Sequence, residues 1–210
     1  NHSDESGTIA ARFATGAADV MHGILHFGVP EWDGNIIARK KNSKGFLEVL
    51  SYLGEDVNDW LAWMAGHRAK ELAKQGRENN LTEEEIEALI KLPNTPQKRK
   101  NFETVKRYYN KLNTAMLDLA EHAGTVDPES RKSWESEWYI PFYRETEAAN
   151  LFSGPSVNRG LSGQHSGIKR LKGSRKATKD LLENILQNYT KLVDSSMKNH
   201  ALKTAVDNLK

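Results

Sequence analysis

The chain contains no cysteine, which excludes disulfide bonds, thiolate catalysis and cysteine metal sites and is typical of a reducing compartment. No apolar run approaches the ~18–20 residues that a membrane helix requires, so we expect no membrane partner. The N-terminal residues lack the basic and then apolar pattern of a secretory signal. An excess of one charge is also missing, because the chain has 30 basic and 28 acidic residues. Any binding of nucleic acid must therefore depend on local clusters of charge.

Sequence motifs for common chemistry are missing as well. The chain has neither the phosphate-binding loop of P-loop enzymes nor the glycine pattern of dinucleotide-binding folds. His22 and His26 are four apart and share a helix face, but a third metal ligand would have to come from Glu31 or Asp33. His165 lies in a loop without a nucleophile elbow. We therefore predict no cofactor, no metal site and no catalytic residue.

Apolar periodicity predicts helices over most of the chain. Between residues 97 and 123 the apolar positions step by three and four, which is typical of a helix packed against others. Thr82–Glu85 has the pattern of a capping box at a helix start. A long last helix is expected to begin near Thr178, with Leu202 and Leu209 on its buried side.

Strand signals are confined to Ile36 and Ile37, which follow a turn at Trp32–Asn35. No neighbouring segment has the pattern of a partner strand. We therefore predict an all-α fold: an irregular multi-helix bundle with a long C-terminal helix and at most one short β-hairpin.

Two prolines, Pro93 and Pro96, indicate a hinge or a boundary between subdomains. The sequence predicts an N-terminal helical part over residues 1–92 and a C-terminal helical part over 97–210. The second part includes a long loop at 145–177, and loops of that length are usually functional or disordered. We expect one compact module cut from a longer protein, because the chain begins without methionine and ends within a helical pattern.

An aromatic cluster follows the expected helix start at Pro128. That helix is expected to carry Trp134 and Trp138 one turn apart and to end at Pro141. The full set that we single out is Trp134, Trp138, Tyr139, Phe142 and Arg144. Such residues most often pack a helix end against a core, with Arg144 holding a carboxylate or a helix C-terminus. The alternative is that the aromatic rings stack on nucleic-acid bases.

The segment Glu135–Arg144, with Trp134 ahead of it, resembles part of the large polyvalent protein-associated domains found in long fused proteins of bacteriophages and other mobile elements. Lys172–Arg175, followed by Leu182–Asn188, is similar to the same family, and looser matches occur at Gly28–Gly34 and Trp60–Arg68. The resemblance implies a helical module of phage or prophage origin, with other domains in the parent chain. It implies a location in the bacterial host cytoplasm, or in the phage particle before delivery, and it brings no catalytic residues.

Basic residues form three clusters. The first runs from Lys169 to Lys179 ahead of the last helix, where backbone amides and the helix dipole also attract phosphate. The candidate nucleic-acid-binding residues are Lys169, Arg170, Lys172, Arg175, Lys176, Lys98, Arg99 and Lys100. The second cluster begins with Lys98, Arg99 and Lys100 and continues with Lys106, Arg107 and Lys111. The third cluster consists of Arg39, Lys40, Lys41 and Lys44. The alternative interpretation is that all of these charges are simply solvated.

Together these features predict a non-catalytic structural or interaction module. We expect its partners to be nucleic acid, contacted through the basic loop, or other domains of the parent chain. A first alternative is a hydrolytic enzyme, with a site between the loop 154–167 and the segment 134–144 that uses His165, Glu135 or Glu137, and Arg144. A second alternative is a self-associating scaffold module.

Overall fold

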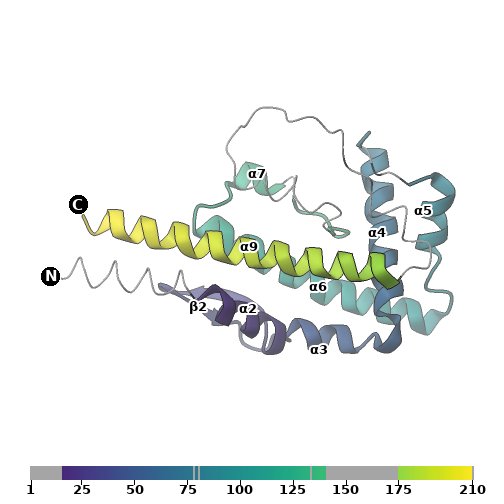
Figure 1. Ribbon diagram of the computed structural model, residues 1–210, viewed down its shortest axis with the longest axis horizontal. Helices are drawn as coiled ribbons and strands as arrows, with labels where there is room; N and C mark the ends of the chain where they lie inside the picture. The colour runs from purple at the N-terminus through teal and green to yellow at the C-terminus, as the bar shows by residue number, and fades with distance from the viewer. Residues whose placement is uncertain (1–15, 78, 80, 133, 141–174, 210) are drawn as a thin grey trace. The chain divides into compact units, whose positions relative to one another are not determined.

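The computed structural model describes residues 16–77, 79, 81–132, 134–140 and 175–209 of the 210. These residues are mainly helical, as the sequence predicted, with 69% in helix and 5% in strand (Figure 1). Within those ranges, no helix combines the length and the apolar character needed to cross a bilayer.

The elements follow one another in a simple order along the chain. They are α2 (Ala17–His26), β1 (Pro30–Asp33), β2 (Ile36–Arg39), α3 (Phe46–Ser51), the 3₁₀ helix η1 (Gly54–Asp56), α4 (Val57–Lys74), α5 (Glu83–Ile90), α6 (Pro96–His122), α7 (Pro128–Lys132) and α9 (Arg175–Asp207).

The chain divides into two compact units, each built from segments that are distant in sequence. Unit 1 comprises Asn1–Ser51, Arg107–Glu135 and Asn188–Lys210. Unit 2 comprises Tyr52–Lys106 and Ser136–Gln187. The helices α6 and α9 each contribute one part to unit 1 and the other part to unit 2. The predicted parts 1–92 and 97–210 stay a prediction.

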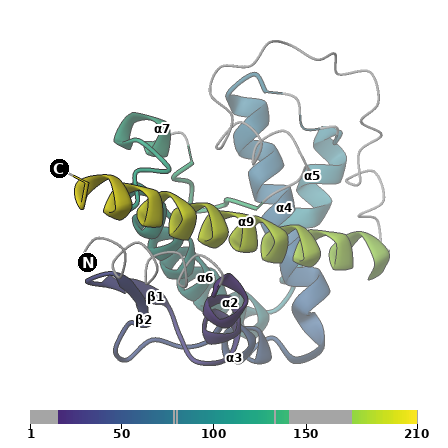
Figure 2. The same cartoon turned by 60° about the vertical axis from the view of Figure 1, so that its left-hand side comes forward.

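Unit 1 contains the hairpin of β1 and β2, which pair antiparallel in the register Pro30 with Arg39 (Figure 2). The turn requires a backbone φ of +59° at Gly34, a value that glycine adopts without steric cost. The partner strand, Pro30–Asp33, was not predicted from the sequence. Its proline occupies the first position of the strand, where proline is tolerated. The Trp32 indole N–H donates to the carbonyl of Leu119 at 3.1 Å, which fixes the hairpin to α6.

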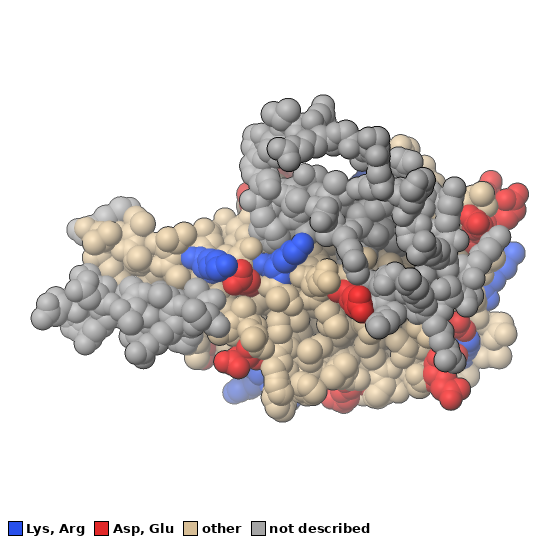
Figure 3. Space-filling view, viewed as in Figure 1, with Lys and Arg blue, Asp and Glu red and all other residues tan. Residues whose placement is uncertain are grey.

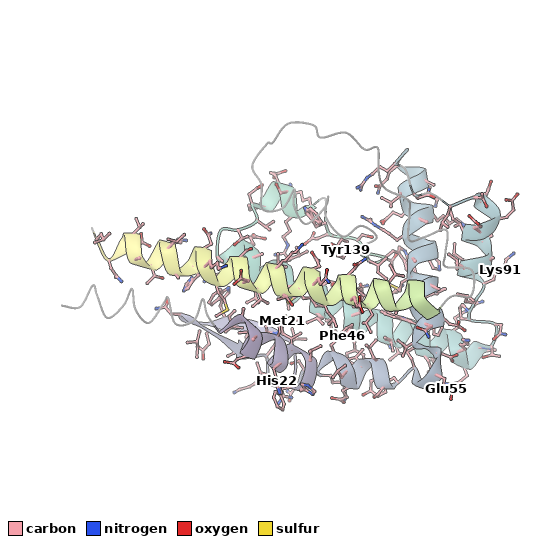
Figure 4. All side chains as sticks on the ribbon, viewed as in Figure 1. Met21, His22, Phe46, Glu55, Lys91 and Tyr139 are labelled. Carbon is pink, nitrogen blue, oxygen red and sulfur yellow. The ribbon has the colours of Figure 1, made fainter. Side chains whose placement is uncertain are left out.

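Aromatic rings fill the core of unit 1. Phe46 on α3 lies 6.1 Å from the ring of Tyr109 and 6.4 Å from the ring of Tyr189, and all three are almost fully buried. The Tyr189 hydroxyl donates to the amide oxygen of Asn113. On α2, Met21 is buried while His22, on the opposite side, is exposed (Figure 4).

Unit 2 is built around α4, whose buried residues occupy almost its whole circumference from Trp60 to Leu72. Helix α5 packs against α4 at Gly66, where a methyl group would lie only 2.6 Å from Cβ of Leu89. The capping box is confirmed: the Thr82 hydroxyl accepts from the amide of Glu85, and the Glu85 carboxylate accepts from the amide of Thr82.

The prediction that one helix carries Trp134 and Trp138 is wrong, because α7 ends at Lys132. The described residues after it, 134–140, form turns and irregular backbone that contact α4. The Ser136 hydroxyl hydrogen-bonds to the Glu71 carboxylate at 2.7 Å and also accepts from the amide of Trp138 at 3.1 Å.

Helix α9 differs from the prediction at both ends. It begins at Arg175, three residues before the expected start. The prediction that Leu202 and Leu209 are buried is wrong, since their exposed fractions are 66% and 81%. Ser196 is fully buried instead, and its hydroxyl donates to the carbonyl of Leu192. Periodicity identifies the face of a helix, but burial also requires a neighbouring element to cover that face.

Candidate nucleic-acid interface

The basic run ahead of α9 falls largely outside the described residues. Lys169, Arg170 and Lys172 belong to the undescribed range 141–174, and the backbone of Arg175 and Lys176 forms the first turn of α9. The interface that the sequence predicted there stays a prediction.

The second predicted cluster opens α6 in unit 2. The Lys98 ammonium lies 2.7 Å from Asp59 and 3.0 Å from Asp56, so two carboxylates compensate its charge. The hydrogen bond to Asp59 is the main reason that the pKa of Lys98 is raised. Arg99 and Lys100 are exposed. The cluster therefore offers two solvent-facing cations to a polyanion.

Unit 1 has a groove that joins the third predicted cluster to the later part of α6. Its volume is about 630 Å³. We call it the basic groove. It is lined by Val29, Lys40, Lys41, Asn42, Ser43, Lys44, Arg107, Tyr108, Asn110, Lys111, Thr114, Ala115 and Asp118. Five of these residues are basic and one is acidic, so the groove is strongly cationic in a chain whose total charge is nearly balanced.

The loop after β2 forms one wall of the basic groove. Ser43 fixes this loop: its hydroxyl accepts from the amide of Val29 at 2.8 Å and donates to the carbonyl of Lys40 at 2.6 Å. Asn42 has a φ of +58°, which asparagine tolerates better than most residues. Gly28 permits the close approach, because a Cβ there would lie 2.4 Å from the Ser43 hydroxyl. The loop therefore presents Lys40 and Lys41 from a well-bonded backbone.

Helix α6 forms the other wall. Arg107 and Lys111 are exposed and one helical turn apart, about 6 Å along the axis. The Lys111 ammonium lies 5.7 Å from the centre of the Tyr108 ring. The single acid, Asp118, is paired with Arg131 at 2.7 Å.

Charge compensation differs among the groove lysines. Lys44 is paired with Glu48 on α3. Lys40, Lys41 and Lys111 form no salt bridge within the described part of the chain. The two walls therefore carry cations whose electrostatic attraction is available to an external anion.

Neighbouring residues of α6 serve different purposes. Lys106 precedes Arg107 in sequence but belongs to unit 2, where its side chain is 9% exposed and bonds to Glu103 and Glu137 at 2.9 Å each. Its ammonium also lies 3.8 Å from the centre of the Trp138 ring. Lys106 therefore stabilises unit 2 and does not contribute to the basic groove.

The aromatic segment 134–140 contributes to packing in unit 2. The ring of Trp138 stacks on His67 at 3.8 Å and meets Trp63 edge-on at 5.1 Å. Tyr139 is buried, and the Arg68 guanidinium lies 5.8 Å from the centre of its ring. Phe142 and Arg144 lie outside the described residues.

The pKa of His67 is lowered to about 4, mainly by burial and also by the nearby Lys106 ammonium, against the opposing effect of Glu103. His67 is therefore neutral at physiological pH. A neutral imidazole stacked on Trp138 is consistent with a packing role for this ring.

The groups invoked for a hydrolytic site are engaged elsewhere or undescribed. Glu135 binds Arg131 at 2.8 Å, and Glu137 binds Lys106. His165 and Arg144 lie outside the described residues.

The paired histidines of α2 have ring centres 4.5 Å apart and are both exposed. Within the described ranges, no group of three or more histidine or acidic side chains could hold a metal ion.

Sequence reasoning identified both lysine-rich stretches but not their meeting in one groove. On the face drawn in Figure 3, basic and acidic side chains are mixed over the described surface. One local signal could have indicated the groove: Arg107 and Lys111 are four residues apart on one helix, and Tyr108 lies between them in sequence. No protein-family model matches the chain, and no curated protein or solved structure shows significant similarity to it.

Proposed function

We propose that this chain is a non-catalytic helical-bundle module of a phage or mobile-element polyvalent protein, and that it binds nucleic acid through the phosphate backbone at the basic groove. The observation that supports the proposal is the convergence of Lys40 and Lys41 with Arg107 and Lys111 on opposite walls of one groove. The resemblance of the segments around Trp134 and Lys172 to polyvalent protein domains supports the proposed origin.

Charge and geometry both favour a polyanion as ligand. Phosphate contacts by lysine and arginine supply most of the affinity of non-specific nucleic-acid binding, through release of condensed counterions. Arginine binds phosphate with a planar fork, and lysine binds it as a point charge. A groove with cations on both walls can contact one strand from two sides, which a single exposed lysine cannot do.

The experiment is a titration of fluorescently labelled nucleic acid by anisotropy, repeated from about 50 to about 200 mM salt. The test variant is the triple substitution Lys40→Gln, Lys41→Gln and Lys111→Gln. Each lost phosphate contact lowers the slope of log K against log salt by about 0.7 to 0.9, so we expect a slope about 2 to 3 units smaller.

The matched control removes the same charge elsewhere in unit 1. Lys191, Lys198 and Lys203 are exposed on α9, and none of them lines the basic groove. Their replacement by glutamine is expected to leave the salt slope close to that of the wild type. Equal losses in the control and the test variant would show that only net charge matters, and the groove assignment would then be wrong.

The predicted run ahead of α9 is tested separately by the triple substitution Lys172→Ala, Arg175→Ala and Lys176→Ala. An additional decrease in slope would show that this run also contacts nucleic acid. A decrease confined to this variant, with full binding by the groove variant, would place the interface at the run instead. Absence of binding at low salt would refute the proposal as a whole.

A further inference from the structure

The basic groove also contains features that phosphate contacts alone do not require. On the α6 side its lining includes one aromatic ring, Tyr108, and two uncharged polar residues, Asn110 and Thr114. Tyr108 and Asn110 lie between the cations Arg107 and Lys111 in sequence, and Thr114 follows Lys111 by three residues. A surface that only attracted a phosphate backbone would need neither a ring nor an amide.

The size of the groove favours a ligand that enters it. Its volume of about 630 Å³ falls within the roughly 300–1,000 Å³ range of sites that enclose small molecules. A nucleotide of a single strand can place its unstacked base in such a space. In a duplex the bases are stacked and paired inside the helix, so a duplex would contact the groove only at its rims.

Tyr108 provides a surface on which a base can stack. Proteins that bind single strands combine a cationic groove with aromatic rings, because every base has a face that can stack. The Lys111 ammonium lies over the Tyr108 ring, 5.7 Å from its centre, so a base that stacks on that face would move the ammonium aside, toward the phosphate of the same nucleotide.

The opposite wall is held before any ligand binds. Ser43 hydrogen-bonds to the backbone of Val29 and of Lys40, and the amide of Lys40 donates to the carbonyl of Val29 at 2.8 Å. A wall whose backbone is already ordered loses less conformational entropy when a strand binds. Lys40 and Lys41 are therefore placed to contact phosphates that flank the stacked base.

We infer that the basic groove binds single-stranded nucleic acid, with one base stacked on Tyr108 and the flanking phosphates held by Arg107 and Lys111 on α6 and by Lys40 and Lys41 on the loop. The inference rests on the proposed function and adds to it the strandedness of the ligand and the role of an uncharged residue. It requires no sequence specificity, because stacking tolerates every base.

The experiment compares an oligothymidylate of about 12 nucleotides with a duplex of the same length, using the full chain and its Tyr108→Leu and Tyr108→Phe variants. Loss of one stacked base is expected to weaken single-strand binding by Tyr108→Leu roughly tenfold. Its salt slope is expected to match the wild type, because no charge is removed. Tyr108→Phe retains the ring and is expected to bind like the wild type.

A second measurement does not depend on the folding of a variant. An oligonucleotide carrying a photoreactive halogenated uracil is crosslinked to the wild-type chain, which is then digested with trypsin. Cleavage after Arg107 and Lys111 releases the peptide Tyr108–Lys111. We expect the crosslink on this peptide, and a crosslink found only on other peptides would overturn the inference.

The outcomes separate the two proposals. Equal binding of duplex and single strand, or unchanged single-strand binding by Tyr108→Leu, overturns the inference while a salt slope that depends on Lys40, Lys41 and Lys111 still supports the proposed function. If neither nucleic acid binds at low salt, both proposals are wrong.

Discussion

The packing of α4 against α5 leads to a prediction in which two energetic effects oppose each other. Gly66 lies inside α4 and faces α5. A Cβ added there would lie 2.6 Å from Cβ of Leu89 and 3.4 Å from the backbone nitrogen of Ile90. The Leu89 Cβ is bonded directly to the backbone, so no rotation of the side chain can relieve this contact. Relief requires α5 to shift away from α4.

The expected free-energy change follows from the two opposing contributions. Alanine is favoured over glycine inside a helix by about 1 kcal/mol. Overpacking of a close contact typically costs about 1–3 kcal/mol. Because the contact involves atoms that cannot move independently, we expect the cost to exceed the gain, and Gly66→Ala to lower the free energy of unfolding by up to about 2 kcal/mol.

The chain offers a matched control for the same substitution. Gly23 lies inside α2, and no heavy atom lies within 4 Å of the position that its Cβ would occupy. Only the helical preference then changes, so Gly23→Ala is expected to raise the free energy of unfolding by about 0.5–1 kcal/mol. The two variants should therefore shift stability in opposite directions.

The assay is urea and thermal unfolding of both variants beside the wild type. A change of 1 kcal/mol corresponds to a shift of about 2–4 °C in Tm for a chain of this size. Stabilisation by Gly66→Ala equal to that of Gly23→Ala would show that α5 does not press against α4 at this position. The packing argument for unit 2 would then be refuted.

Three further predictions concern stability. Thr82→Ala removes the hydroxyl that accepts from the amide of Glu85 and is expected to cost about 1 kcal/mol in urea unfolding; no loss would show that the cap contributes nothing. The pKa of His67 is about 4 in the folded chain and about 6.5 when unfolded, so between these values the unfolded chain binds more protons and stability rises with pH. Unfolding at a series of pH values should show a weaker dependence across this window in His67→Gln, and an identical dependence would contradict the lowered pKa. On α9, Ile185→Ala is expected to cost about 2–5 kcal/mol because Ile185 is fully buried, whereas Leu202→Gln should change stability by less than about 0.5 kcal/mol; similar losses would mean that Leu202 is covered.

Local signals in the sequence were reliable where neighbouring residues alone determine the structure. The capping box at Thr82 is such a case, since both of its hydrogen bonds join residues three apart. The turn at Gly34 is another, because a positive φ favours glycine whatever surrounds it. The same signals did not reveal β1 as the partner of β2, since a proline and two acidic residues in Pro30–Asp33 obscure the strand pattern.

The tertiary structure decided what local signals could not. Trp138 does not lie in a helix as predicted. Its segment hydrogen-bonds to Glu71 and packs on His67, and both residues are far from it in sequence. Leu202 continues the apolar spacing of α9, yet it is exposed because no described neighbour covers that face.

The sequence by itself determined that the chain is mainly helical, where α5 begins, where α6 begins and ends, and which stretches are rich in lysine and arginine. Only the tertiary structure decided that the loop carrying Lys40 and Lys41 lies across a groove from Arg107 and Lys111. Helical periodicity and capping depend on interactions across a few residues, which a local pattern records. A groove depends on which distant segments pack together, and that is set by the burial of the whole core.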